Sequence, residues 1–374
     1  MMLELIFWVC VFFIWYGYFG YPLLIRLLAK IRPKEVKKGK IEPSITVLIP
    51  AYNEERIIEE KIQNALSLDY PKDKLEIIIA SDGSTDSTVQ IAKKYLSYGV
   101  KILEYPRHQG KAGLINKSML QAQGEIIVFS DASGMLDISA VREIVANFND
   151  PKIGCVCGLY RMVPEEESLA SKGYKTYLEY DIKMKKSESR FSTILGAHGA
   201  LYAIRRELFE QIPEHIINDD FYIPVMIVAK GYRAIYEDKA IALDKVRYTL
   251  KDEFRRRLRI GFGNWQQTLE FKNILKPSMW LLAWQFFSHK ILRNIMPFFL
   301  ITAFILSFVL QGIIYKIFFY AFILLILLAL IGGIFTKLKI TSELLYTPFF
   351  FVIGNIAYLV GTFKFLFGRN KIKW

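Results

Sequence analysis

The clearest indication of the fold class is the segment Gly124 to Ser133, which reads GEIIVFSDAS. Its centre, at 126–129, is wholly apolar and rich in β-branched residues, which is typical of a strand covered on both faces. The run ends in oxygen-bearing side chains, among them Asp131. Because ligands of open α/β sheets gather beyond the carboxyl ends of parallel strands, Asp131 is a candidate site residue. The alternative is that Asp131 only caps or turns the segment that follows.

Three similar apolar runs precede this stretch, at 45–49, 75–80 and 100–104. Apolar residues at helical spacing lie between the four runs, at 57–66, 89–96 and 110–123. Strands that alternate with helices in this way predict βαβ units, right-handed crossovers and a mostly parallel sheet of the α/β class.

Polar residues follow three of these strands: Tyr52, Asn53 and Glu54 after the first, Asp82 after the second and Asp131 after the fourth. We expect them along one edge of the sheet, with Asn53 as a helix cap. No glycine-rich dinucleotide or P-loop pattern occurs at a strand–helix junction. Carboxylates without such a loop suit a nucleotide whose phosphates are carried on a divalent cation.

The composition indicates membrane segments at both ends of a chain long enough for two or three units. Of the 374 residues 53% are hydrophobic, and this apolar content gathers at the two ends. The net charge of +13 is compatible with nucleic acid, but cytoplasmic loops beside membrane spans also carry surplus Lys and Arg. We therefore expect a lipid bilayer and no nucleic acid as partner. Three cysteines exclude a disulfide framework, and Cys155 and Cys157 do not form a zinc pattern.

The segment boundaries follow from this patterning. Residues 1–29 predict an N-terminal transmembrane anchor rather than a signal peptide, since no cleavage site follows. The basic linker 30–43 places the domain at 44–270 in the cytoplasm. Residues 278–293 predict an interfacial amphipathic helix, with a core helix as the alternative. Two to three transmembrane helices follow at 294–367, with a break at Lys316, and then a basic tail at 368–374.

The last of these segments, 344–367, leaves two topologies open. If it crosses, the C-terminus is outside the cell, and the basic tail then contradicts the positive-inside rule. If it re-enters, the tail stays inside.

Four ordered motifs resemble the membrane-bound branch of family 2 glycosyltransferases, which includes cellulose, chitin, hyaluronan and poly-N-acetylglucosamine synthases. They are ITVLIPAYNEE from Ile45, IIIASDGSTDST from Ile77, GKAGLINKSM from Gly110 and IIVFSDAS from Ile126. The likeness extends to about Gln267 through the glycine-rich turn at 194–206, the acidic pair Asn218-Asp219-Asp220 and the arginine motif at 256–260. It implies a GT-A fold and an inverting enzyme that uses a nucleotide-sugar with Mg²⁺ or Mn²⁺.

The resemblance also implies a role for each site residue. It gives Asp220 as the general base beside Asp219, and it gives Asp131 and position 133 as the metal site. The remaining residues fall into two sets: donor binding by Tyr52, Glu54, Asp82, Lys111 and Asp131, and acceptor or diphosphate contacts by Arg205, Arg256 and Arg259. Two positions depart from the family pattern. Ser133 stands where an acidic residue is usual and is a weaker ligand for a hard cation, and Ile260 stands where tryptophan is usual.

The leading hypothesis is a cell-membrane enzyme that transfers sugar from a UDP-sugar to a polysaccharide or oligosaccharide and forms a β-linkage. A lipid acceptor, such as a glycolipid or polyprenyl phosphate, is the alternative within the enzyme class. Ser133 and Ile260 favour a different hypothesis, a non-catalytic nucleotide-sugar-binding scaffold. A transporter is disfavoured because the spans carry no charged residues deep inside them.

Overall fold

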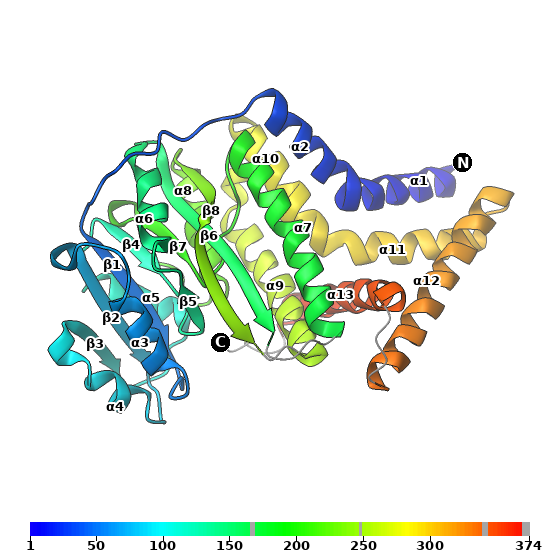
Figure 1. Ribbon diagram of the computed structural model, residues 1–374. Helices are drawn as coiled ribbons and strands as arrows, with labels where there is room; N and C mark the ends of the chain where they lie inside the picture. Colours follow the sequence, from blue (N-terminus) through cyan, green and yellow to red (C-terminus); the bar gives the residue numbers. More distant parts are fainter. Residues whose placement is uncertain (165–168, 247–248, 339–342, 369–374) are drawn as a thin grey trace. The chain divides into compact units, whose positions relative to one another are not determined.

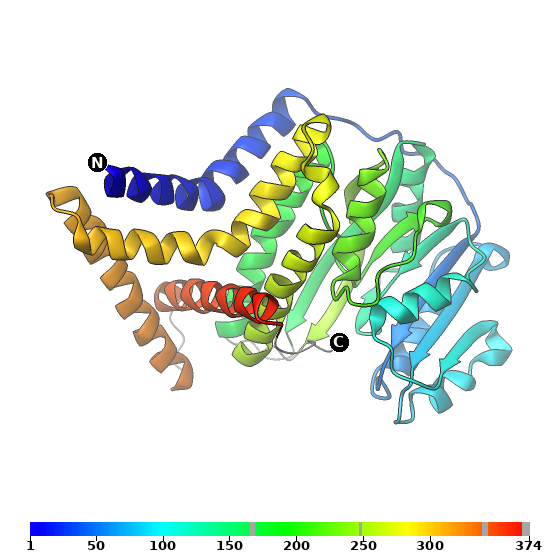
Figure 2. The same cartoon turned by 180° about the vertical axis from the view of Figure 1, so that it is seen from behind.

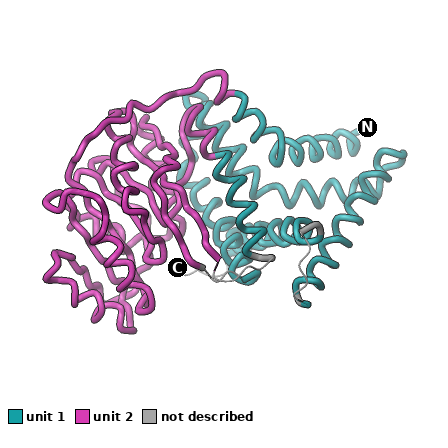
Figure 3. The backbone as a smooth tube through the Cα atoms, viewed as in Figure 1, with its two compact units in different colours: residues 1–27, 166–184, 247–371 teal, residues 28–165, 185–246, 372–374 magenta. Residues whose placement is uncertain are grey.

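The chain forms two compact units. The computed structural model describes residues 1–164, 169–246, 249–338 and 343–368 (Figure 1). We call residues 28–165 and 185–246 the sheet unit, and residues 1–27, 166–184 and 247–371 the helical unit (Figure 3). The basic tail with Arg369, Lys371 and Lys373 lies outside the described residues.

The sheet unit contains one eight-stranded sheet in the order β3-β2-β1-β4-β7-β6-β8-β5. Its strands are β1 (Ile45–Ala51), β2 (Leu75–Asp82), β3 (Val100–Tyr105), β4 (Ile126–Phe129), β5 (Gly134–Leu136), β6 (Ile153–Pro164), β7 (Tyr202–Arg205) and β8 (Arg233–Val246). Strands β1 to β4 are parallel, as the alternation of strands and helices predicts. The other half is mixed: β7 is antiparallel to β4 and β6, β6 is parallel to β8, and β5 is antiparallel to β8.

The core of the sheet unit explains the apolar runs. Every residue of β1 and β4 is buried, since these central strands are covered on both faces. One hydrophobic cluster joins Val47 and Val128 of these strands to Ile62 of α3 and Ile144 of α6. The helices of this unit are α3 (Ile58–Leu66), α4 (Thr88–Lys93), α5 (Lys111–Met119), α6 (Ala140–Val145), α8 (Asp219–Ala229) and the last turns of α7 (Leu169–Phe191).

The basic segment before β1 is bound to the sheet unit. Val36 and Ile41 pack against the hydrophobic core, and the Gly39 N–H donates to the Ala146 carbonyl at 3.0 Å. Lys38 forms an ion pair with the buried carboxylate of Glu237. This segment is therefore part of the folded unit, although its many basic residues are typical of a solvated linker.

Among the residues that the structure describes, four helices are long and apolar enough to cross a membrane. These candidate spans are Met2–Ile31, Pro277–Val309, Ile313–Thr336 and Leu345–Leu366. The helices of the helical unit are α1 (Met2–Trp15), α2 (Tyr21–Ile31), α9 (Leu250–Glu270), α10 (Trp280–Phe286), α11 (Leu292–Val309), α12 (Ile313–Lys337) and α13 (Glu343–Leu366). In both Figure 1 and Figure 2 α1 lies beside α11, where Phe13 stacks on Phe299 at a ring distance of 5.2 Å.

One boundary in the helical unit differs from the sequence prediction. The segment expected to lie in the interface, 278–293, runs directly into the next span, because the π-helical turn Phe287–Ile291 joins α10 to α11. The break between α11 and α12 lies at 310–312 rather than at Lys316. Gly312 ends the break with a positive φ of 130°, a conformation that glycine adopts without steric cost.

Candidate functional site

Four of the expected residues lie beyond the carboxyl ends of adjacent parallel strands. In the register of the sheet Ala51 pairs with Ser81 and Leu48 pairs with Phe129, so β1, β2 and β4 point the same way. Tyr52 and Glu54 follow β1, Asp82 ends β2 and Asp131 follows β4. We call this row the donor edge.

Asn53 connects the motif that begins at Ile45 with the motif that begins at Ile77. Asn53 has a positive φ of 55°, and its side-chain oxygen accepts the Thr85 N–H at 2.8 Å. The Glu54 N–H donates to the Thr88 hydroxyl at 2.8 Å. The expectation that Asn53 caps a helix is wrong, because α3 begins five residues later without a side-chain cap. Asn53 instead shapes the turn that presents Tyr52 and Glu54.

Asp82 organises the loop in front of α5. Its carboxylate is fully buried and accepts the N–H groups of Gln109 at 3.0 Å and Gly110 at 2.9 Å. The ring of His108 lies 2.9 Å from the same carboxylate and packs against Tyr52 with ring centroids 4.2 Å apart. Asp82 thereby fixes the start of α5, whose first residue is Lys111.

Lys111 lies between carboxylates from two distant parts of the chain. Its ammonium nitrogen is 2.7 Å from Asp131 Oδ1 and 3.3 Å from Asp219 Oδ1. The other oxygen of Asp219 accepts the Tyr202 hydroxyl at 3.1 Å. Lys111 and Asp219 are nearly buried, whereas the side chain of Asp131 is 38% exposed. The structure thus brings the third and fourth motifs to the acidic pair, with Asp131 open to solvent.

The charges of this cluster shift the pKa values of its members. Burial alone would lower the pKa of Lys111, but the carboxylates of Asp131, Asp219 and Asp220 outweigh it and raise that pKa. Burial raises the pKa of Asp219 to about 6, opposed by Lys111 and reinforced by Asp220 and Asp131. Burial, followed by the charges of Asp131 and two other carboxylates, also raises the pKa of Glu54. Perturbed carboxyl groups gathered in this way are typical of functional sites.

The acidic pair sits in the first turn of α8. Negative side chains are favourable there because the helix N-terminus carries partial positive charge. The Ala197 N–H donates to the Asp220 carbonyl at 2.7 Å and ties the glycine-rich turn to this helix. At Gly199 an added Cβ would lie 2.6 Å from Asp131 Oδ2, so a larger residue there would displace the Asp131 carboxylate.

Arg205, one of the three arginines expected at the site, does not lie at the donor edge. Arg205 pairs with Ile126 at the start of β4, the end opposite to Asp131, and its guanidinium donates to the carbonyls of Ile153, Phe148 and Asp150. Arg256 and Arg259 belong to α9 in the helical unit. There Arg256 lies over the ring of Tyr174 at 4.3 Å from its centroid.

Sequence reasoning missed three residues near the donor edge, namely Lys61, Tyr202 and Asp244. Lys61 is fully buried, and its ammonium donates to Ser130 Oγ at 2.7 Å and to the Gly134 carbonyl. It therefore joins the two ends of the loop that carries Asp131 and Ser133. Burial lowers the pKa of Lys61 to about 7, although Asp131 and Asp244 oppose this shift.

The donor edge offers oxygen ligands to a hard cation but no preassembled cage. Within the described ranges no group of three His, Cys, Asp or Glu side chains could hold a metal ion. Asp131, with its partly exposed carboxylate, fits a cation that brings further oxygens with it, as Mg²⁺ bound to a diphosphate does. The arrangement can bind a diphosphate-linked donor and present a carboxylate to an incoming hydroxyl group.

Comparisons with known proteins show which proteins this chain is similar to. The model of the family described as "Glycosyl transferase family 2" matches residues 46–213. The chain is 28% identical over 249 residues to "Probable glycosyltransferase YdaM" of Bacillus subtilis (strain 168), covering 64% of this chain and 59% of that protein. It is 27% identical over 251 residues to "Poly-beta-1,6-N-acetyl-D-glucosamine synthase" of Staphylococcus aureus (strain COL), covering 66% and 60%. The chain thus spans about 60% of the length of these relatives.

The fold of the whole chain also has a solved counterpart. It is similar to "Mannosyltransferase PcManGT from Pyrobaculum calidifontis in complex with GDP-Man and Mn2+" with a TM-score of 0.75. The likeness covers 98% of this chain and 100% of that one at 23% identity, which shows a shared fold. Residues 46–213, which carry the matched motifs of the donor edge, thus belong to glycosyl transferase family 2.

Proposed function

We propose that this enzyme is an inverting membrane glycosyltransferase that moves a sugar from a UDP-sugar to a polysaccharide or oligosaccharide and forms a β-linkage. The observation that carries the proposal is the position of Lys111 between Asp131 and Asp219 at the donor edge. This arrangement joins a cation-binding carboxylate to the acidic pair that faces an acceptor. The similarity to a poly-β-1,6-N-acetylglucosamine synthase supports a carbohydrate acceptor.

The donor edge would hold the nucleotide-sugar. Tyr52, Glu54 and the loop fixed by Asp82 would contact the nucleoside, and Lys111 would contact the diphosphate. A Mg²⁺ or Mn²⁺ ion at Asp131 would supply positive charge that stabilises the leaving diphosphate. Arg256 and Arg259 remain proposed contacts of the diphosphate or acceptor, supported by their motif alone.

Asp220 would act as the general base. Both carboxylate oxygens of its neighbour Asp219 are already engaged, one by Lys111 and one by Tyr202, and Asp219 is only 3% exposed. Asp220 is half-buried and is therefore the more accessible of the two. It would take the proton of the acceptor hydroxyl as that oxygen attacks the sugar from the face opposite the diphosphate, which inverts the configuration.

The membrane segments would hold the enzyme in the cell membrane with the donor edge in the cytoplasm. The long apolar helices support membrane association. The surplus of basic residues between Lys30 and Lys40 supports the cytoplasmic side. Nucleotide-sugar would then reach the site from the cytoplasm.

The test is transfer by the purified full-length protein in lipid nanodiscs. We would offer a panel of UDP-sugars and GDP-mannose with carbohydrate and lipid acceptors, and identify products by mass spectrometry. We expect a β-linked carbohydrate product from a UDP-sugar that requires Mn²⁺ or Mg²⁺. Transfer from GDP-mannose alone would contradict the proposal that the donor is a UDP-sugar. A singly glycosylated lipid as the product would contradict a carbohydrate acceptor. Full activity in excess chelator would contradict the requirement for a divalent cation.

A further inference from the structure

A second carboxylate lies beside the loop that carries Asp131 and Ser133. Strand β5 follows this loop and pairs with β8, so that Gly134 stands opposite Asp244. The side chain of Ser133, the residue before Gly134, is near enough to lower the pKa of the Asp244 carboxyl, which burial raises. A residue far along the chain thus supplies a carboxylate next to the position where the family motif has its own acidic residue.

Asp244 is buried without a full set of partners. The residue is only 8% exposed, and its Oδ2 accepts the Tyr160 hydroxyl at 3.0 Å. Its Oδ1 is buried and has no hydrogen-bond partner among the residues that the structure describes. A buried carboxylate oxygen without a partner is costly, and such groups in proteins are normally paired or bound to a metal.

Two further carboxylates, those of Asp131 and Glu54, are close enough to Asp244 for their charges to interact. If Asp244 served only as an acceptor for Tyr160 and Ser133, a neutral asparagine would serve equally well and avoid the buried charge. The carboxylate at this position therefore calls for a positive partner that the described side chains do not provide at contact distance.

We infer that Asp244 is a ligand of the donor's divalent cation, replacing the acidic residue that Ser133 does not supply. This inference rests on the proposed cation-dependent donor site. Asp131 and Asp244 would provide the protein oxygens, and Ser133 and Tyr160 would orient Asp244. Diphosphate oxygens and water would complete the coordination, as is usual when Mg²⁺ is held by one or two carboxylates.

The test measures cation binding rather than turnover. Mn²⁺ binding to the purified full-length protein is followed by electron paramagnetic resonance with saturating UDP, and again with GDP. We expect Asp244→Asn to weaken Mn²⁺ binding at least tenfold, because loss of an orienting partner alone costs about 10- to 100-fold. The double variant Asp244→Asn with Ser133→Asp should recover most of the affinity, since it restores a carboxylate to the loop. Tyr160→Phe is the comparison variant: it removes one hydrogen bond to Asp244 but keeps its charge, so it should weaken Mn²⁺ binding less than Asp244→Asn does.

The outcomes separate this inference from the proposed function. Unchanged Mn²⁺ affinity in Asp244→Asn would overturn the inference and leave the donor site intact. Weak binding in both Asp244→Asn and the double variant would also overturn it, because a purely structural role predicts no rescue by Ser133→Asp. If the wild-type protein binds no Mn²⁺ with either nucleotide, the cation-dependent donor site itself is wrong, and the inference falls with it.

Discussion

Replacement of Lys111 by methionine tests the central cluster of the site. The change removes the ammonium group but keeps the length of the side chain, so Asp219 loses the cation 3.3 Å away. Removing one partner of a buried ion pair costs about 3–5 kcal/mol, because the other charge stays buried. The contact with Asp131 adds less than about 1 kcal/mol, since that carboxylate is 38% exposed and screened by water.

This loss translates into a measurable shift in thermal unfolding. For a unit of this size about 3–5 kcal/mol lowers the melting temperature by about 6–20 °C, measured on the detergent-solubilised protein without nucleotide or metal. Lys117→Met is the control, because Lys117 is exposed on the same helix and should change stability by less than about 0.5 kcal/mol. The effect of Lys111→Met should also grow from pH 5 to pH 8, since the carboxylates repel one another once ionised. Equal melting temperatures for the two variants would refute the buried cluster.

Three further predictions concern the base, the acidic pair and the membrane segments. Asp220→Asn should lower turnover about 100-fold or more with donor binding nearly intact; near-normal turnover would move the base to Asp219. The folded pKa of Asp219 is about 6 against a usual 3.8, so the stability it contributes is present below pH 4 and lost as pH rises through 6. The melting temperature of Asp219→Asn should therefore not show this fall as pH rises through 6. If the melting temperatures of the variant and the wild type change with pH in the same way, the raised pKa of Asp219 is contradicted. Single cysteines at Gly368 and Lys94 should label from one side of intact membranes and a cysteine at Gln311 from the other, with little background because the native cysteines are buried.

The sequence predicted the half of the site that local patterns encode. Buried strands read as apolar runs, and the residue after each parallel strand reaches the donor edge whatever the rest of the sheet does. Local sequence patterns could not predict that β7 runs antiparallel to its neighbour β4. Because β7 runs antiparallel to β4, its first residue, Tyr202, comes near Asp219, and its last residue, Arg205, goes to the opposite end.

Long-range pairing explains the other residues that were missed. The pairing of β5 with β8 brings Asp244 next to the loop that carries Asp131, and local sequence patterns do not predict this pairing. Lys61 did leave a signal, a lone lysine within the apolar stripe of the predicted helix at 57–66. A charged residue on a buried face needs polar partners, and Ser130 and Gly134 provide them.

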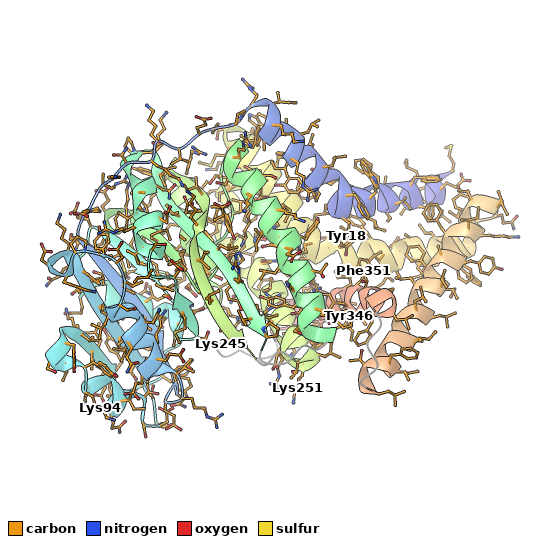
Figure 4. All side chains as sticks on the ribbon, viewed as in Figure 1. Tyr18, Lys94, Lys245, Lys251, Tyr346 and Phe351 are labelled. Carbon is orange, nitrogen blue, oxygen red and sulfur yellow. The ribbon has the colours of Figure 1, made fainter. Side chains whose placement is uncertain are left out.

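The contacts of α13 bear on whether this helix crosses the membrane. Near its start Tyr346 fills the space beside Gly173 of α7, where an added Cβ would lie 1.9 Å from the ring. In its first half Phe351 packs on Tyr18 at 5.1 Å (Figure 4). Near its end Thr362 accepts the indole N–H of Trp265 at 2.9 Å, and Phe365 meets the same indole ring. Along most of its length α13 therefore lies beside α9 or α7.

Helix α9 is too polar to lie in the hydrocarbon core of a bilayer. Its charged residues include Lys251, Asp252, Glu253, Arg255, Arg256, Arg257, Arg259 and Glu270. Each would be costly at that depth, and charges in spanning helices are rare. Because α13 packs along α9, we predict that it lies at the level of α9, at the boundary of the membrane.

The opposite boundary is marked by a different cluster. There Phe7 of α1, Leu306 of α11 and Tyr315 of α12 pack together at the end of α11 that is distant from α9. Within the described residues α13 contributes to the cluster of Tyr346 and Phe350 with Tyr177 and not to that one. Both ends of α13 lie beside the charged helices α7 and α9, which favours a re-entrant segment at 344–367 over one that crosses the membrane. That reading also keeps Arg369, Lys371 and Lys373 on the side where the positive-inside rule expects them, so the basic tail no longer conflicts with a cytoplasmic catalytic domain.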